Sequence, residues 1–152
     1  MRQREWDVPR STSPESTEYR ERGRNILSIS ATLEDHDSLC RILHDPDWHI
    51  TRAFSCQQAI ACLCRDRMGV IVCDCHLPDG SWKDILSHIA ELTEPSVVIV
   101  TSGAAGADLR AQVRTLGGYD VLCKPFFPAE VRRVVSAASQ ERAVPARTLV
   151  RA

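Results

Sequence analysis

The fold of this chain is decided by the stretch Val70-Ile-Val-Cys-Asp-Cys-His-Leu-Pro-Asp-Gly80. Its first part is apolar on both faces, which is typical of a strand in the middle of a parallel sheet. Pro78 and Gly80 then indicate a turn. One acidic side chain, Asp74, therefore stands where a buried strand passes into a loop.

Strands and helices alternate on both sides of this stretch. Short apolar runs predict four more strands, at 25–30, 49–54, 96–101 and 119–123. The run at 49–54 is the more polar one, as expected for a strand at the edge of a sheet. Segments with an apolar stripe at helical spacing follow each strand. Five strands alternating with five helices predict an α/β fold, a doubly wound five-stranded parallel sheet with helices on both faces.

Local signals mark several helix ends. Thr32 is followed three residues later by Asp35, which resembles a capping box. Glu34 and Asp35 are also acids of the kind that stabilise a first helical turn. Ser55 is expected to cap the second helix, and Gly117-Gly118 is expected to end the fourth.

Length and composition indicate one globular domain. The chain has 152 residues, 43% of them hydrophobic, and a net charge of −1. Residues 1–24 are polar and lack apolar periodicity, so we predict a disordered arm there, the domain at 25–141 and a flexible tail at 142–152. The charge gives no general field for nucleic acid or an anionic membrane. No apolar run is long enough to cross a bilayer or forms a secretory signal, so we expect a cytoplasmic protein.

Seven cysteines are spread through the chain. An odd number in apolar segments is a poor disulfide framework. Cys62-Leu-Cys64 and Cys73-Asp-Cys75 have one intervening residue, fewer than is usual at structural zinc sites. We expect most of the seven to be buried as small hydrophobic side chains. The alternative is a soft-metal or redox cluster made by Cys73, Cys75, His76 and Cys123.

Three polar residues stand at the carboxyl ends of three successive predicted strands: Asp74, Thr101 and Lys124. Functional groups gather at this edge of a doubly wound sheet. A carboxylate can attack phosphorus as a nucleophile. A lysine and a hydroxyl can each hold a phosphoryl oxygen as charge develops. The three residues together therefore favour a phosphoryl-transfer site.

Residues 25–140 resemble the receiver domains of two-component response regulators, which have the flavodoxin-like fold of the chemotaxis receivers. Three motifs carry the resemblance. They are the stretch from Val70 to Gly80, the strand Val98-Ile-Val-Thr-Ser102 and the segment Val121-Leu-Cys-Lys-Pro-Phe126. The resemblance implies the strand order 2-1-3-4-5.

The resemblance also implies roles for individual residues. Asp74 takes the phosphoacceptor position, Thr101 is the switch hydroxyl, and Lys124 binds the phosphoryl group. The peptide bond between Lys124 and Pro125 is expected to be cis. A magnesium ion would be held by Asp74 and by the main-chain carbonyl of His76.

The sequence departs from the receiver pattern at the metal site. Receivers carry two acidic residues after the first strand, and alignment of residues 26–30 on that strand puts Ser30 and Ala31 there. Magnesium needs hard oxygen ligands, usually with one or two carboxylates among them. If each lost carboxylate costs about 2 kcal/mol, magnesium affinity falls roughly a thousandfold. Glu34 and Asp35 lie nearby and offer partial compensation, although helix-start acids are the simpler interpretation.

A second departure concerns the switch. Receivers commonly have an aromatic residue three positions before the lysine, and this chain has Val121 there. Tyr119 is displaced by two residues and is expected on the same strand face. A valine cannot change rotamer between a buried and an exposed position as a tyrosine does. We therefore expect the usual coupling between Thr101 and the output surface to be weakened.

We expect a stand-alone receiver that takes a phosphoryl group from a histidine kinase or phosphotransfer protein and signals through protein contact. The alternative is a pseudo-receiver, a protein-binding module that acts without phosphorylation. We do not expect an enzyme, because no second catalytic base, glycine-rich phosphate loop or cofactor fingerprint is present. A downstream partner or a second copy of the chain would bind the last two helices, which carry Arg110, Arg114, Arg132 and Arg133.

Overall fold

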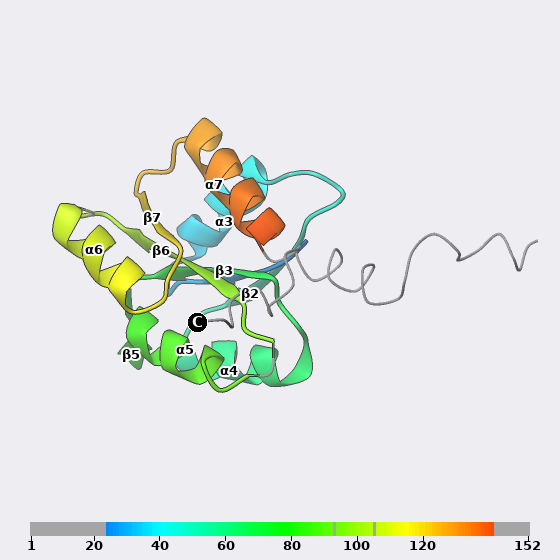
Figure 1. Ribbon diagram of the computed structural model, residues 1–152. Coiled ribbons are helices and arrows are strands. Elements are labelled where there is room, and N and C mark those ends of the chain that lie inside the picture. The colour runs from blue at the N-terminus through cyan, green and yellow to red at the C-terminus, as the bar shows by residue number, and fades with distance from the viewer. Residues whose placement is uncertain (1–23, 93, 105, 142–152) are drawn as a thin grey trace, which may run out of the picture.

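Five parallel strands form one sheet in the computed structural model, which describes residues 24–92, 94–104 and 106–141. They are β1 (Asn25–Ile29), β2 (His49–Ala53), β3 (Val70–Asp74), β6 (Val97–Ser102) and β7 (Asp120–Cys123). Their order across the sheet is β2-β1-β3-β6-β7, and every neighbouring pair is parallel (Figure 1). The predicted fold class and strand order are confirmed, and the polar strand β2 lies at an edge.

The helices cover both faces of this sheet (Figure 1). They are α3 (Leu33–Ile42), α4 (Cys56–Arg65), α5 (Trp82–Ile89), α6 (Ala107–Thr115) and α7 (Pro128–Glu141). Helices α3 and α7 pack over one face, where their apolar side chains share a buried cluster with β1, β3, β6 and β7. Helices α4, α5 and α6 contribute to the cluster on the opposite face.

The strands supply both clusters because successive side chains point to opposite faces. In β1, Ile26 faces α3 and α7, whereas Leu27 faces α4 and α5. In β3, Ile71 and Val72 divide in the same way, and both are buried. Burying each such aliphatic side chain stabilises the fold by about 1.5–3 kcal/mol. This two-sided burial is why the central strands are apolar throughout.

A small hairpin follows Asp74 and was predicted only as a turn. Strands β4 (His76–Leu77) and β5 (Gly80–Ser81) pair antiparallel. Ser81 then caps α5 in a capping box with Asp84. Gly80 fits a close approach, since a Cβ atom there would lie 2.5 Å from Asp84 Oδ2 and 2.9 Å from Cys56 Sγ and would force these side chains to shift.

The same loop is fastened to the helix on its other side. Asp79 accepts hydrogen bonds from the main-chain N–H groups of Cys56 and Gln57, at 2.7 and 3.0 Å. These are first-turn donors of α4 that have no partner within the helix. The loop that follows Asp74 is therefore held by side-chain contacts as well as by its hairpin.

Two of the three predicted helix-end signals are confirmed. The Ser55 hydroxyl accepts a hydrogen bond from Gln58 N at 3.1 Å and caps α4. Gly117, just after α6, has φ 102°, a left-handed conformation that favours glycine. The capping box at Thr32 is wrong, because Thr32 makes no side-chain cap hydrogen bond at the start of α3. The carboxylate of Asp35 instead contacts the side chains of Ser30 and Lys124.

The predictions about the arm and tail, the cysteines and membrane spans have separate outcomes. The predicted arm and tail fall outside the described residues, apart from Arg24. All seven cysteines are free, but only Cys56, Cys62 and Cys73 are buried, so the prediction that most of them are buried is wrong. Cys64 lies on the exposed side of α4. Among the helices that the structure describes, none has the length and apolar character needed to cross a membrane.

Candidate functional site at the carboxyl edge of the sheet

The sheet register brings the predicted site residues to one edge. Asp74 is the register partner of Thr101 on the neighbouring strand. Lys124 directly follows β7, and its main-chain N–H donates to Ser102 O at 2.9 Å. Because the three strands are parallel, their carboxyl ends meet here. The structure therefore places Asp74, Thr101 and Lys124 side by side along this edge.

Asp74 and Lys124 are in direct contact. The ammonium nitrogen Nζ of Lys124 lies 3.1 Å from Asp74 Oδ1. The same carboxylate oxygen accepts a hydrogen bond from the main-chain N–H of Cys75 at 2.9 Å. Thr101 is 4% exposed and takes no part in this ion pair. The peptide bond between Lys124 and Pro125 is cis.

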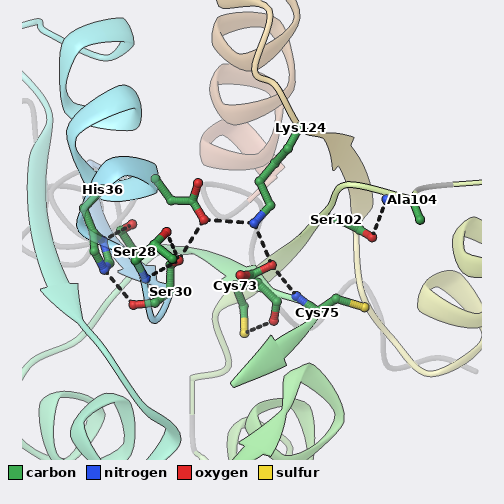
Figure 2. A network of polar contacts seen from close by, with 11 residues as sticks. Ser28, Ser30, His36, Cys73, Cys75, Ser102, Ala104 and Lys124 are labelled. Carbon is green, nitrogen blue, oxygen red and sulfur yellow. Dashed lines mark hydrogen bonds and ion pairs between the residues drawn. The ribbon is translucent and has the colours of Figure 1, made fainter. Parts of the chain in front are cut away.

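Lys124 has a second carboxylate partner. Its Nζ atom donates to Oδ2 of Asp35 at 2.9 Å, although Asp35 belongs to the first turn of α3, 89 residues earlier in the chain. The hydroxyl of Ser30 donates to the same oxygen at 2.8 Å. Figure 2 shows this network, with two dashed contacts that meet at the Lys124 ammonium group. Asp35 is thus a member of the site.

Partial burial strengthens the two ion pairs. The side chains of Lys124, Asp35 and Asp74 are 24%, 19% and 16% exposed, so water screens their charges less than at an open surface. Burial by itself would raise the pKa of Asp35, but hydrogen bonds from Lys124 and Ser30 outweigh it and the pKa is lowered. Burial would lower the pKa of Lys124, and the two carboxylates outweigh it and raise that pKa. The contact between Asp35 and Lys124 therefore favours the charged form of both groups.

A buried histidine supports the strand end next to this network. His36 is 0% exposed, its Nε2 lies 2.9 Å from the carbonyl oxygen of Ser30, and its Nδ1 lies 2.8 Å from the hydroxyl of Ser28. Its ring also meets Phe54 edge-on, with centroids 4.5 Å apart. Burial lowers its pKa. In the neutral ring, Nε2–H donates to the carbonyl and Nδ1 accepts from the hydroxyl, which satisfies every polar atom involved.

The oxygen donors around Asp74 determine whether magnesium can be held. Ser30 and Ala31 carry no charge, and the Ser30 hydroxyl is engaged with Asp35. Within the described part of the chain, no three His, Cys, Asp or Glu side chains form a group that could hold a metal. Two carboxylates remain, Asp74 and Asp35, and both lie within 3.1 Å of a single cation, the Lys124 ammonium group. Two carboxylates with a carbonyl and waters suit magnesium, but the set is smaller than a full receiver site.

Two cysteines near the site, Cys73 and Cys75, have raised pKa values. Burial, followed by the charge of Asp74, raises the pKa of the Cys75 thiol. Cys73 points into the core and its pKa is also raised, again mainly by burial. The described residues contain no metal-binding group that includes Cys73, Cys75, His76 and Cys123. These observations do not favour the soft-metal or redox alternative, because reactive cysteines need a lowered pKa.

The structure contradicts one prediction about the switch position, which concerns Val121 and Tyr119. Val121 is fully buried in the cluster under α4 and α5. Tyr119 packs against the opposite cluster, under α3 and α7, so the expectation that the two residues share a face is wrong. Tyr119 lies just before β7, where the alternation of the strand has not begun.

Comparison with known proteins identifies the family to which this fold belongs. A family model of the response regulator receiver domain matches residues 33–136. The hydrogenase transcriptional regulatory protein HoxA of Cupriavidus necator is 30% identical over 104 residues, 68% of this chain and 21% of that protein. The probable transcriptional regulatory protein TcrX of Mycobacterium tuberculosis is 34% identical over 84 residues, 55% of this chain and 36% of that protein. The chain thus spans between about a fifth and a third of the length of these relatives.

Solved structures show the same fold. The signal receiver domain of a LuxO repressor protein from Vibrio parahaemolyticus superposes with a TM-score of 0.75 at 22% identity, covering 85% of this chain and 98% of that one. The beryllofluoride-activated NtrC4 receiver domain dimer gives a TM-score of 0.72 at 27% identity, covering 78% and 98%. The parallel sheet, the residues at its strand ends and these matches lead to one conclusion. The chain belongs to the response regulator receiver domain family.

Proposed function

We propose that this receiver accepts a phosphoryl group on Asp74 and signals by protein–protein contact. The observation that carries the proposal is the 3.1 Å approach of Lys124 Nζ to Asp74 Oδ1 at the strand end. Lys124 Nζ and the main-chain N–H of Cys75 both contact Oδ1 of this carboxylate. Oδ2 is therefore the oxygen we assign to nucleophilic attack.

The reaction is a displacement at phosphorus. Asp74 Oδ2 forms a new bond to phosphorus, while the bond from phosphorus to the donor breaks and its electron pair leaves with the donor group. The Lys124 ammonium group is placed to bind a phosphoryl oxygen as negative charge accumulates. Thr101, beside Asp74 in the register, is the hydroxyl that we assign to a second phosphoryl oxygen.

Asp74, Asp35 and the main-chain carbonyl of His76 are the groups that would hold magnesium. The ion would neutralise charge on the incoming phosphoryl group. Its affinity is expected to be low, because Ser30 and Ala31 supply no carboxylate and Asp35 is already paired with Lys124. We therefore expect phosphorylation to require more magnesium than a receiver with the full acidic pair.

A histidine kinase or a phosphotransfer protein is the expected phosphoryl donor, and a protein partner or a second copy of the chain is the expected target. The last two helices, α6 and α7, are the proposed contact surface. Arg114, Arg132 and Arg133 are exposed there. Arg110 is engaged, since its guanidinium group pairs with Asp120 at 3.0 Å. Exposed arginines of this kind fit an acidic protein surface better than an apolar one.

Acetyl phosphate tests the proposal without a cognate kinase. Purified protein is incubated with acetyl phosphate and magnesium, and intact mass is measured for the wild type and for Asp74→Ala. We expect the wild type to gain one phosphoryl group and the variant to gain none. An equal gain in Asp74→Ala would refute the assignment of Asp74.

A second candidate function is favoured by a different observation. Ser30 and Ala31 leave the metal site short of carboxylates, and Val121 is a fully buried residue at the expected switch position. These residues favour a pseudo-receiver that binds its partner constitutively. Absence of any mass gain at high magnesium, with protein that unfolds cooperatively, would select this candidate over the first.

A further inference from the structure

Asp35 is the charged residue of the site that no strand-end motif contains. It lies in the first turn of α3, where an acid would ordinarily serve the helix terminus. Its carboxylate makes no capping box with Thr32, and Oδ2 accepts from Lys124 at 2.9 Å instead. The contact crosses from the start of one helix to the end of the last strand.

Ser30 gives this carboxylate a fixed orientation. Its hydroxyl donates to Asp35 Oδ2 at 2.8 Å and accepts from the main-chain N–H of Thr32 at 3.2 Å. The carbonyl of Ser30 is held in turn by buried His36 at 2.9 Å. A carboxylate at position 30 could not donate a hydrogen bond to Asp35 and would repel it. The serine is therefore the residue that makes Asp35 available to Lys124.

The arrangement of charges indicates that Asp35 restrains the ammonium group of Lys124. One ammonium group lies between two carboxylates, and all three side chains are less than a quarter exposed. A lysine has four rotatable side-chain bonds, and a single contact with Asp74 would restrain it weakly. If Asp74 accepts a phosphoryl group, its carboxylate becomes an acyl phosphate and the negative charge lies on the phosphoryl oxygens, whereas Asp35 keeps its own carboxylate charge. Asp35 can then keep Lys124 within reach of the new phosphoryl oxygens.

We propose that Asp35 is the positioning residue for Lys124: its carboxylate, oriented by the Ser30 hydroxyl, holds the lysine ammonium group beside Asp74. The functional importance of this contact rests on the proposed phosphoryl acceptance by Asp74. The contact itself exists in the unphosphorylated protein, so it can be tested without any phosphoryl donor.

The first test observes the Lys124 ammonium group directly by ¹H–¹⁵N NMR of lysine side chains. A signal absent from Lys124→Met identifies it. In the wild type we expect a resolved signal, because ammonium protons held by two carboxylates exchange slowly with water. Asp35→Asn, which keeps the shape and removes the charge, is expected to lose that signal. Glu34→Gln is the matched control on the same helical turn, and it is expected to keep the signal because Glu34 is exposed.

The second test measures how strongly Asp35 and Lys124 are coupled. Urea unfolding is compared for the wild type, Asp35→Asn, Lys124→Met and the double variant, which isolates the pairwise contribution. We expect Asp35→Asn to raise the unfolding equilibrium constant about tenfold more in the wild type than in the Lys124→Met background. A signal that survives Asp35→Asn, or effects that simply add, would overturn the proposal.

These outcomes are separable from those of the phosphorylation experiment. If acetyl phosphate gives no mass gain while the NMR signal and the coupling behave as expected, only the proposed function fails. If Asp74 is phosphorylated while Asp35 and Lys124 are uncoupled, only the positioning role fails.

Discussion

Replacing His36 by Leu is expected to lower the free energy of unfolding by about 2–6 kcal/mol. The side chain is 0% exposed and hydrogen-bonds the Ser30 carbonyl and the Ser28 hydroxyl, at 2.9 and 2.8 Å. Leucine fills a similar volume but leaves both groups buried without a partner. Each such group costs about 1–3 kcal/mol, which sets the expected total. Urea unfolding followed by circular dichroism measures the change.

Two further variants make this prediction specific. Ser28→Ala in the His36→Leu background removes one stranded hydroxyl, so it is expected to recover about 1 kcal/mol. The same His→Leu change at exposed His44 is the control, and it is expected to alter stability by less than about 0.5 kcal/mol. A loss below about 1 kcal/mol for His36→Leu, or no recovery with Ser28→Ala, would refute the view that His36 supports the Ser30 strand end.

Three other perturbations test separate parts of the account. Burial lowers the pKa of His36 from 6.5, so its stabilising contribution is present above pH 6.5 and is lost as pH falls through the folded-state pKa. The free energy of unfolding of the wild type, measured with urea, should therefore fall over that pH range. An equally steep fall in His36→Leu would contradict this origin. Gly80→Ala brings a Cβ atom within 2.5 Å of Asp84 Oδ2 and 2.9 Å of Cys56 Sγ, and thermal unfolding should show a loss of about 1–3 kcal/mol, whereas unchanged stability would mean that both side chains move freely. Asp35→Asn should raise the magnesium concentration needed for half-maximal labelling by acetyl phosphate about tenfold, through loss of one of two carboxylates; an unchanged requirement would remove Asp35 from the metal site.

The sequence was sufficient to predict the residues at the strand ends. Asp74, Thr101 and Lys124 each follow an apolar run, and the carboxyl ends of parallel strands necessarily meet at one edge. The register then confirms what the chain order predicted. The edge position of β2 was predictable for a similar reason, because a polar strand cannot be buried on both faces.

Asp35 was predicted only as an acid near the metal site, and neither its contact with Lys124 nor the role of His36 could be predicted from the sequence. Both lie in the first turn of α3, where acids and polar residues are ordinary. Their partners depend on the angle at which α3 leaves β1 and on the position of Lys124, which comes 89 residues later than Asp35. A polar Ser28 inside an otherwise apolar strand was the available signal for His36, since a buried hydroxyl needs a partner.

Other differences have equally local causes. The hairpin of β4 and β5 has two-residue strands, too short for a recognisable alternation. Cys64 is exposed because it falls on the outer side of α4, which a count of cysteines in apolar segments does not resolve. Tyr119 precedes β7, so the period of two residues does not yet apply to it.

Phosphorylation of Asp74 is tested by intact mass spectrometry after incubation of the protein with acetyl phosphate and magnesium. We predict a gain of one phosphoryl group that hydroxylamine removes, as expected for an acyl phosphate. The gain should be absent in Asp74→Asn and retained in Asp108→Asn, the same change at an exposed aspartate of α6. No gain in cooperatively folded wild-type protein at high magnesium, or a gain that persists in Asp74→Asn, would contradict it.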